Sequence, residues 1–247
     1  MIEGVHFLPD QDMADVAWKL VATNLSDLAA KGAEPAGILL SHSLCPDDDR
    51  FVEGLGEVLK AYDCALLGGD TVSGDGPRTY GATAIGRASH SPVPSRGGAQ
   101  IGDALFITGP VGAAMLGFEA LRDKTGADSS AYCRPDPLLA EGQALAPHVT
   151  AMMDVSDGLL LDTSRIARAS KVTLDIETDS VAISVPEDRR NEALRWGDDY
   201  QLLFTLPVNT TLPISATRIG QVLAATDSPI LLDGTPPKAG TPLGYSH

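Results

Sequence analysis

The sequence is short of cysteine and of long apolar runs, and each shortage excludes a class of protein. Its three cysteines, Cys45, Cys64 and Cys133, are odd in number and show no C-x-x-C spacing, so neither a disulfide framework nor a zinc site is indicated. No apolar run approaches the roughly 20 residues that cross a bilayer. The N-terminus lacks the basic and apolar regions of a secretory signal. We therefore expect a cytoplasmic protein with buried free thiols and no membrane partner.

Basic residues are also few, because 18 Lys and Arg face 33 Asp and Glu and give a net charge of -15. Nucleic acid is not expected as a partner, since its phosphates would be repelled. Small phosphorylated ligands remain compatible with this charge if divalent cations lie between carboxylates and phosphates. With 43% hydrophobic and 21% charged residues, the 247-residue chain is typical of an ordered globular protein with room for two modest domains.

In the first part of the chain, apolar residues recur at helical spacing in some stretches and form short strand-like runs in others, which is typical of mixed α and β structure. Asp12 is expected to cap a helix that ends at Gly32, with Asp27 and Lys31 as an ordinary i, i+4 pair on its polar face. The other predicted elements are a strand end at 1–7, a strand over 36–44, a helix with its core face at 51–62, a strand over 64–67 and a strand over 78–88.

A segment rich in Pro, Gly and Ser, 89–102, is the clearest boundary in the sequence. It divides the chain into an N-terminal domain, 1–93, and a C-terminal α+β domain, 94–247. The predicted elements of the second domain are a strand over 104–108, a helix to 121, a loop over 122–134, a helix ending near 146, a strand near 174–177, a helix over 186–196, a strand over 201–206 and an irregular end over 234–247.

The strand-to-helix junction DVSDG, 154–158, places two carboxylates beside each other. Asp154 lies at the end of a buried strand and Asp157 at the start of a helix, so both can face one cation. The alternative is that Asp157 or Ser156 only caps the helix. Capping would explain one carboxylate and leave the other without a role.

Two further stretches carry candidate ligand contacts. Gly68 and Gly69 precede Asp70 after a short apolar strand, and glycine there would let the backbone approach a ligand closely. A tight turn closed by the Asp70 side chain explains the same residues. Arg96 stands in the linker, where it is either a phosphate contact or a solvated arginine.

Several motifs in one order resemble the thiamine-monophosphate kinase family, within the superfamily of aminoimidazole ribonucleotide synthetase. The motifs are EGVHF at 3–7, NLSDLAAKGAEP at 24–35, GGDT at 68–71, DVSDG at 154–158, GDDYQLLF at 197–204 and the terminal GYSH. The resemblance implies a two-domain α+β architecture whose N-terminal domain dimerises through its sheet. It also implies transfer of a phosphoryl group from ATP to thiamine monophosphate.

The resemblance assigns roles to individual residues. Those implied to bind magnesium are Asp27, Asp70, Asp154 and Asp157. Those implied to contact ATP are Gly69, Asp70, Arg96 and Ser156. Those implied to contact the thiamine part of the substrate are His6, Asp198 and Tyr245, which would pull the terminal GYSH against the protein.

The implied chemistry needs no side-chain nucleophile. The acceptor phosphate has a second pKa of about 6 and is largely dianionic near neutral pH, so no proton has to be removed from it. Magnesium and Arg96 would instead reduce the repulsion between two polyanions during direct transfer. Tyr245 and Asp198 would suit the cationic thiazolium ring.

This chain departs from the family pattern at its start and at two positions. Family members carry some tens of residues before EGVHF, with further metal ligands. Three explanations are open: a start assigned too late, a truncated sequence, or a shortened homologue with a damaged metal site. Lys31 replaces an uncharged residue, and GDDY replaces the more frequent GEDY. Two alternatives follow: a non-catalytic nucleotide- or metal-binding relic of the family, or a related ATP-dependent synthetase with another small substrate.

Overall fold

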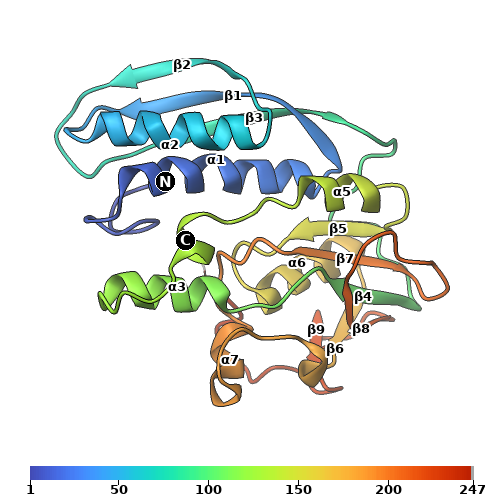
Figure 1. Cartoon of the computed structure of the whole chain (residues 1–247). Helices are drawn as coiled ribbons and strands as arrows, with labels where there is room; N and C mark the ends of the chain where they lie inside the picture. The colour runs from blue at the N-terminus through green and yellow to red at the C-terminus, as the bar shows by residue number, and fades with distance from the viewer. Residues whose placement is uncertain (246–247) are drawn as a thin grey trace.

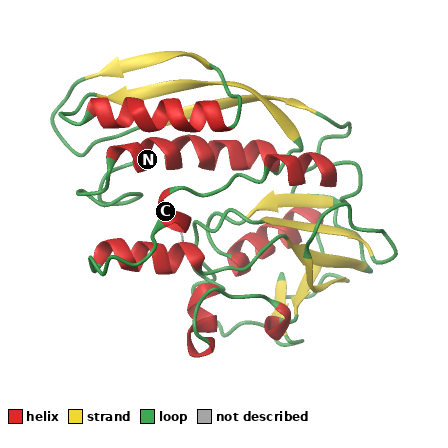
Figure 2. Cartoon of the chain, in the orientation of Figure 1, coloured by secondary structure: helices red, strands yellow, loops and turns green. Residues whose placement is uncertain are grey.

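The computed structural model describes residues 1–245 and arranges them around two sheets (Figure 1). In the first, β1 (Ala33–Ser43) lies between β2 (Leu66–Val72), which is parallel to it, and the antiparallel β3 (Gly81–Ala88). The helices α1 (Met13–Ala29) and α2 (Asp48–Ala61) cover one face of this sheet (Figure 2). Leu20, Ile38 and Phe51 are buried between the helices and the sheet.

No helix covers the opposite face of the three-stranded sheet in the described part of the chain (Figure 2). Leu39, Leu67 and Ile85 lie at 42%, 52% and 43% exposure. Leu67 packs over Gly37, which pairs in register with Ile85. The three side chains therefore form an apolar surface that a single chain leaves open to water.

The second sheet contains six strands in the order β5-β7-β4-β8-β6-β9. Their bounds are β4 Asp103–Ile107, β5 Ala151–Asp154, β6 Thr173–Ile176, β7 Leu202–Pro207, β8 Thr217–Leu223 and β9 Ile230–Leu232. The helices of this part are α3 Ala113–Arg122, α4 Ser130–Cys133, α5 Leu139–Leu145, α6 Leu159–Ser170 and α7 Arg190–Ala193, with 3-10 turns at Thr178–Ser180 and Glu187–Arg189.

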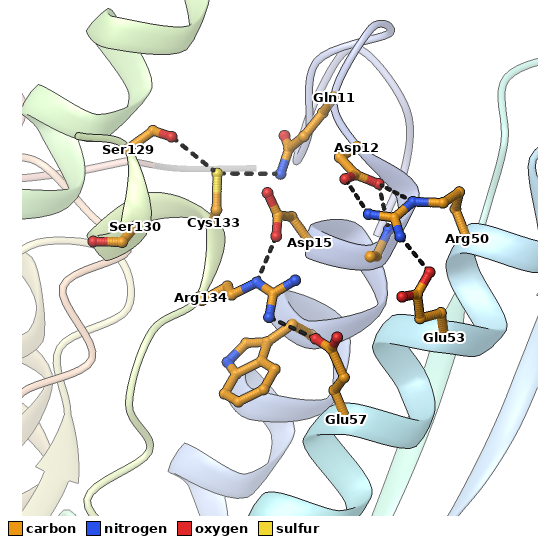
Figure 3. A network of polar contacts seen from close by, with 12 residues as sticks. Gln11, Asp12, Asp15, Arg50, Glu53, Glu57, Ser129, Ser130, Cys133 and Arg134 are labelled. Carbon is orange, nitrogen blue, oxygen red and sulfur yellow. Dashed lines mark hydrogen bonds and ion pairs between the residues drawn. The ribbon is translucent and has the colours of Figure 1, made fainter. Parts of the chain in front are cut away.

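The two parts contact each other through segment 129–136 (Figure 3). Arg134 places its guanidinium 5.1 Å from the ring of Trp18 on α1. It also donates to Asp15 of α1 at 2.5 Å and to Glu57 of α2 at 2.7 Å. These contacts fix α4, which contains Tyr132, against α1.

The structure confirms several predicted elements and corrects others. Asp12 accepts a hydrogen bond from the Ala14 amide at 3.0 Å and caps α1 as expected. The GGDT motif was expected to follow the end of a strand at residue 67, but it lies inside β2, because Leu39 to His42 of β1 supply its pairing partners. Residues 1–7 form bridges and turns instead of a strand end.

The other differences concern length. The predicted loop 122–134 contains the single helical turn α4, and the predicted helix over 186–196 is divided into a 3-10 turn and the short α7. Strands β8 and β9 were not predicted. Within residues 1–245, no helix has both the length and the apolar character that a bilayer span would need.

Candidate functional site

A cavity of about 590 Å³ lies between α1, the N-terminal turn and the loops of the six-stranded sheet. Three residues expected to contact the acceptor, His6, Asp198 and Tyr245, line it together. Ser156 and Asp157 of the DVSDG junction line the same cavity. The rest of the lining is Met1, Val5, Lys19, Thr23, Phe118, Tyr132, Arg195, Trp196, Gly197, Tyr200 and Gly244.

The chain end lies against the DVSDG junction. The Tyr245 amide donates to the Asp157 carbonyl at 2.9 Å, and a Cβ on Gly244 would come within 2.2 Å of the same oxygen. The last two residues of the GYSH motif, Ser246 and His247, lie outside the described residues. The described half of the motif thus forms part of the cavity wall, as expected for a docked chain end.

Asp198 occupies a loop with backbone angles that favour glycine, since its φ is 66° and that of Tyr200 is 49°. Its Oδ2 accepts from the Lys19 ammonium at 2.8 Å, and its Oδ1 accepts from the Tyr200 hydroxyl at 3.0 Å. Burial raises the pKa of Tyr200 well above its usual value, and Asp198 raises it further. The Tyr200 hydroxyl therefore keeps its proton and remains a donor.

Asp162, on α6, holds the DVSDG junction in place through hydrogen bonds to its backbone. Its carboxylate is completely buried and accepts the amides of Ser156 and Asp157, each at 3.0 Å. Arg165 bridges Asp162 at 2.6 Å and Asp157 at 2.5 Å. Burial raises the pKa of Asp162 to about 6, against the lowering effect of the Asp157 amide and Arg165. Gly158 is the N-cap of α6, so neither Ser156 nor Asp157 occupies the capping position that the alternative gave them.

Asp199, beside Asp198, holds a second loop. Its oxygens accept the Gly112 amide at 2.7 Å and the Ala114 amide at 3.2 Å, at the start of α3. Burial is the largest influence and raises the pKa of Asp199 to about 7. The two acidic residues of GDDY thus have different tasks, since Asp198 faces the cavity and Asp199 supports its wall.

Asp27 and Asp154 form an acidic pair where α1 meets β5. Asp154 is 4% exposed and accepts the Ser26 hydroxyl at 2.8 Å. Burial and the charge of Asp27 raise the pKa of Asp154 to about 6. Desolvation also raises the pKa of Asp27, and Arg96 and Lys31 oppose that rise. Asp27 and Lys31 on one side and Arg96 and Asp154, which are distant from them in sequence, are therefore close enough to interact.

Gly69 and Asp70 lie apart from this group within one chain. Asp70 pairs with Ser41 of β1. Ser41 lies eight residues from Ala33, where β1 begins shortly after Asp27 and the end of α1. Eight residues of strand span about 26 Å. It borders a separate hollow of about 330 Å³ with His42 and Tyr80. A Cβ on Gly69 would come within 1.9 Å of the Leu40 carbonyl oxygen, so close strand packing alone requires this glycine.

The oxygen donors of the acidic pair suit magnesium, which proteins commonly hold through one or two carboxylates and the phosphates of the substrate. Across residues 1–245, no three His, Cys, Asp or Glu side chains are grouped to hold a metal alone. Asp27 and Asp154 fit the first arrangement, because a cation would offset the repulsion between them.

Sequence reasoning missed Lys19, Tyr132 and Asp162. Lys19 stands among the core residues of α1 and is only 2% exposed, and a lone lysine on an apolar helix face was the available signal. Asp162 shares the charged face of the α6 pattern with Arg165 and Arg168, a position that favours exposure to solvent. The loop that turns the amides of Ser156 and Asp157 toward Asp162 produces no periodic pattern in the sequence.

Comparisons with known proteins agree with this arrangement. The model for the N-terminal domain of AIR synthase related proteins matches residues 1–88, and the model for their C-terminal domain matches residues 100–210. The thiamine-monophosphate kinase of Escherichia coli O157:H7 is 35% identical over an alignment that covers all of this chain and 84% of the relative.

Two solved structures extend the similarity to three dimensions. The thiamine-monophosphate kinase of Stenotrophomonas maltophilia K279a has a TM-score of 0.86 and 32% identity, covering 95% of this chain and 83% of the other. AaThiL complexed with AMPPCP and TMP has a TM-score of 0.88 and 28% identity, covering 100% of this chain and 84% of the other. The chain belongs to the thiamine-monophosphate kinase family.

Proposed function

We propose that this protein transfers the γ-phosphoryl group of ATP to thiamine monophosphate and so forms thiamine diphosphate and ADP. The proposal depends on one observation: the cavity that His6 and Asp198 line is connected through the DVSDG junction to the acidic pair Asp27 and Asp154. His6, Asp198 and Tyr245 line the cavity. The DVSDG junction connects it to Asp154 at the end of β5.

The cavity suits the organic part of the acceptor. Phe118 lies 5.4 Å from Tyr132 and 5.5 Å from Trp196, measured between ring centroids. These rings offer flat apolar surfaces to a pyrimidine or thiazolium ring, and Tyr245 adds an aromatic face for the cationic ring. Asp198 brings a carboxylate to the same cavity.

The acidic pair suits the reacting phosphates. We infer that Asp27 and Asp154 hold magnesium, with Asp157 as a further predicted ligand, and that Arg96 and Ser156 contact ATP. Asp70, as a predicted metal ligand, and Gly69, as a predicted ATP contact, would have to come from a second copy of the chain, because they lie apart from this group within one chain. Bound magnesium would neutralise charge on the donor and acceptor phosphates. The residues of this chain orient the two reactants, and no side chain is required to remove a proton or form a phosphoenzyme.

Incubation of the purified chain with ATP, magnesium and thiamine monophosphate tests the proposal. We expect thiamine diphosphate in amounts equal to ADP, and strongly reduced turnover in Asp154→Asn. Tight ATP binding without product would overturn the kinase assignment and support the non-catalytic alternative. A covalently phosphorylated protein trapped after mixing with ATP would overturn direct transfer.

We also propose that two copies pair through the uncovered face of the first sheet, defined by Leu39, Leu67 and Ile85. Covering these side chains removes apolar surface from water, and Asp70 at the same sheet would then lie near the partner chain. Light scattering should give twice the monomer mass, and Ile85→Lys should give the monomer. A monomeric wild-type protein would refute this assembly.

We also propose that the reaction takes place in the cytoplasm, and we assign the domains as 1–93 and 94–247.

A further inference from the structure

We infer that Lys19 is a positioning residue for the phosphate acceptor, because its ammonium group fixes the Asp198 carboxylate against which the acceptor ring binds. The inference rests on the proposed function and adds a residue for which sequence reasoning gave no role. It begins from the cost of burying an ammonium group, which proteins bear only where the charge is paired.

Lys19 makes two polar contacts at the cavity wall. Its side chain is 2% exposed and its Nζ lies 2.8 Å from Asp198 Oδ2. The same nitrogen stands 3.5 Å from the centroid of the Tyr132 ring. Tyr132 in turn donates its hydroxyl to the His6 carbonyl at 3.1 Å. Lys19 therefore connects the acidic loop, the aromatic wall and the N-terminal turn.

Asp198 has little freedom once Lys19 is in place. Each of its oxygens accepts one hydrogen bond, from Lys19 or from the buried Tyr200 hydroxyl. Its side chain is still 32% exposed. A carboxylate can accept about four hydrogen bonds, so lone pairs remain available to N–H groups of a ligand. The ion pair presents those lone pairs in one fixed orientation.

The position of Lys19 on α1 relates the two ends of the acceptor. Lys19, Thr23 and Asp27 follow one another at i, i+4 and i+8 and share one face of the helix. Eight residues of helix span about 12 Å. The ring-binding end at Lys19 and the acidic pair at Asp27 are therefore held at a fixed separation. This arrangement favours an acceptor that carries its ring and its phosphate at opposite ends.

Calorimetric titrations with thiamine, thiamine monophosphate and ATP, combined with steady-state kinetics, test this role. Lys19→Met keeps most of the side-chain length and removes the charge. We expect the Kd of thiamine and of thiamine monophosphate to rise roughly 10- to 100-fold, the range for losing a hydrogen bond to a charged group. The Kd of ATP should stay within twofold, because Lys19 acts at the ring end.

A double variant separates positioning from general damage. If Lys19 acts through Asp198, then Lys19→Met combined with Asp198→Asn binds thiamine no more weakly than Lys19→Met alone. Asp198→Asn also serves if Lys19→Met fails to fold, and it should show the same loss for thiamine and none for ATP. Arg189→Met, which breaks an ion pair with Glu119 outside the cavity, is the control and should leave all three constants within twofold.

The outcomes distinguish this inference from the proposed function. Normal or tighter thiamine binding by Lys19→Met overturns the positioning role while turnover by the wild type sustains the kinase. Thiamine binding without turnover in the wild type, lost in Lys19→Met, overturns the kinase and sustains the positioning role. A wild-type protein that binds neither thiamine nor its monophosphate overturns both.

Discussion

Replacement of Asp162 by alanine should destabilise the protein and disorder the DVSDG junction. The change removes the buried acceptor of two amides, those of Ser156 and Asp157. Hydrogen bonds to a charged group contribute about 1.5–3 kcal/mol each. Burial raises the pKa of Asp162 to about 6. The cost of keeping the carboxylate charged in the folded protein therefore offsets part of the stability that these hydrogen bonds contribute. The net loss expected is about 3 kcal/mol.

Urea unfolding and amide hydrogen exchange measure the two effects separately. We expect the free energy of unfolding to fall by that amount and the amides of Ser156 and Asp157 to exchange at least tenfold faster. Asp162→Asn retains an acceptor oxygen, so its loss should be near 1 kcal/mol. Asp188→Ala, at an exposed position, should stay within about 0.5 kcal/mol of the wild type. Unchanged exchange at both amides would refute the assigned role of Asp162.

Two other variants test supports of the site. The pKa of Asp199 is raised to about 7 by burial, so its ionisation opposes folding and wild-type stability should fall as the pH rises from about 4 to 7. Asp199→Asn removes the charge but keeps only one acceptor oxygen for the Gly112 and Ala114 amides, so its stability should depend much less on pH between about 4 and 7; an equally steep fall in the variant would contradict this sign. Gly69→Ala should lose about 2–3 kcal/mol in urea unfolding, because its Cβ meets the Leu40 carbonyl oxygen. Gly74→Ala, whose Cβ meets nothing within 4 Å, should not.

The sequence predicted elements whose causes are local. The cap at Asp12 and the change of period at DVSDG depend on neighbouring residues, and the structure has both a capped α1 and a junction from β5 into α6. The GGDT motif was misplaced because a strand is defined by its partner. Gly68, Gly69 and Asp70 look like turn residues until β1 pairs with them.

The residues of the candidate site that belong to sequence motifs could be predicted. Those that depend on contacts between distant parts of the chain could not. His6, Asp198 and Tyr245 were named from motifs and line one cavity. Lys19 could not be assigned, because its partner lies 179 residues away in the chain. Periodicity reports which face of a helix is buried, but it does not report that a buried face contains a charged pair.

The acidic residues of the site divide into two kinds, and their partners show why. Asp162 and Asp199 each accept two backbone amides, so the fold uses them to shape loops. Asp154 accepts one hydroxyl and faces the charge of Asp27, an arrangement that opposes its own ionisation. The hydrogen bond from Ser26 joins α1 to β5, but the charge of Asp27 beside Asp154 adds no stability to the fold. Binding of a cation between phosphates and carboxylates would supply the compensation, which is the condition that the proposed reaction requires.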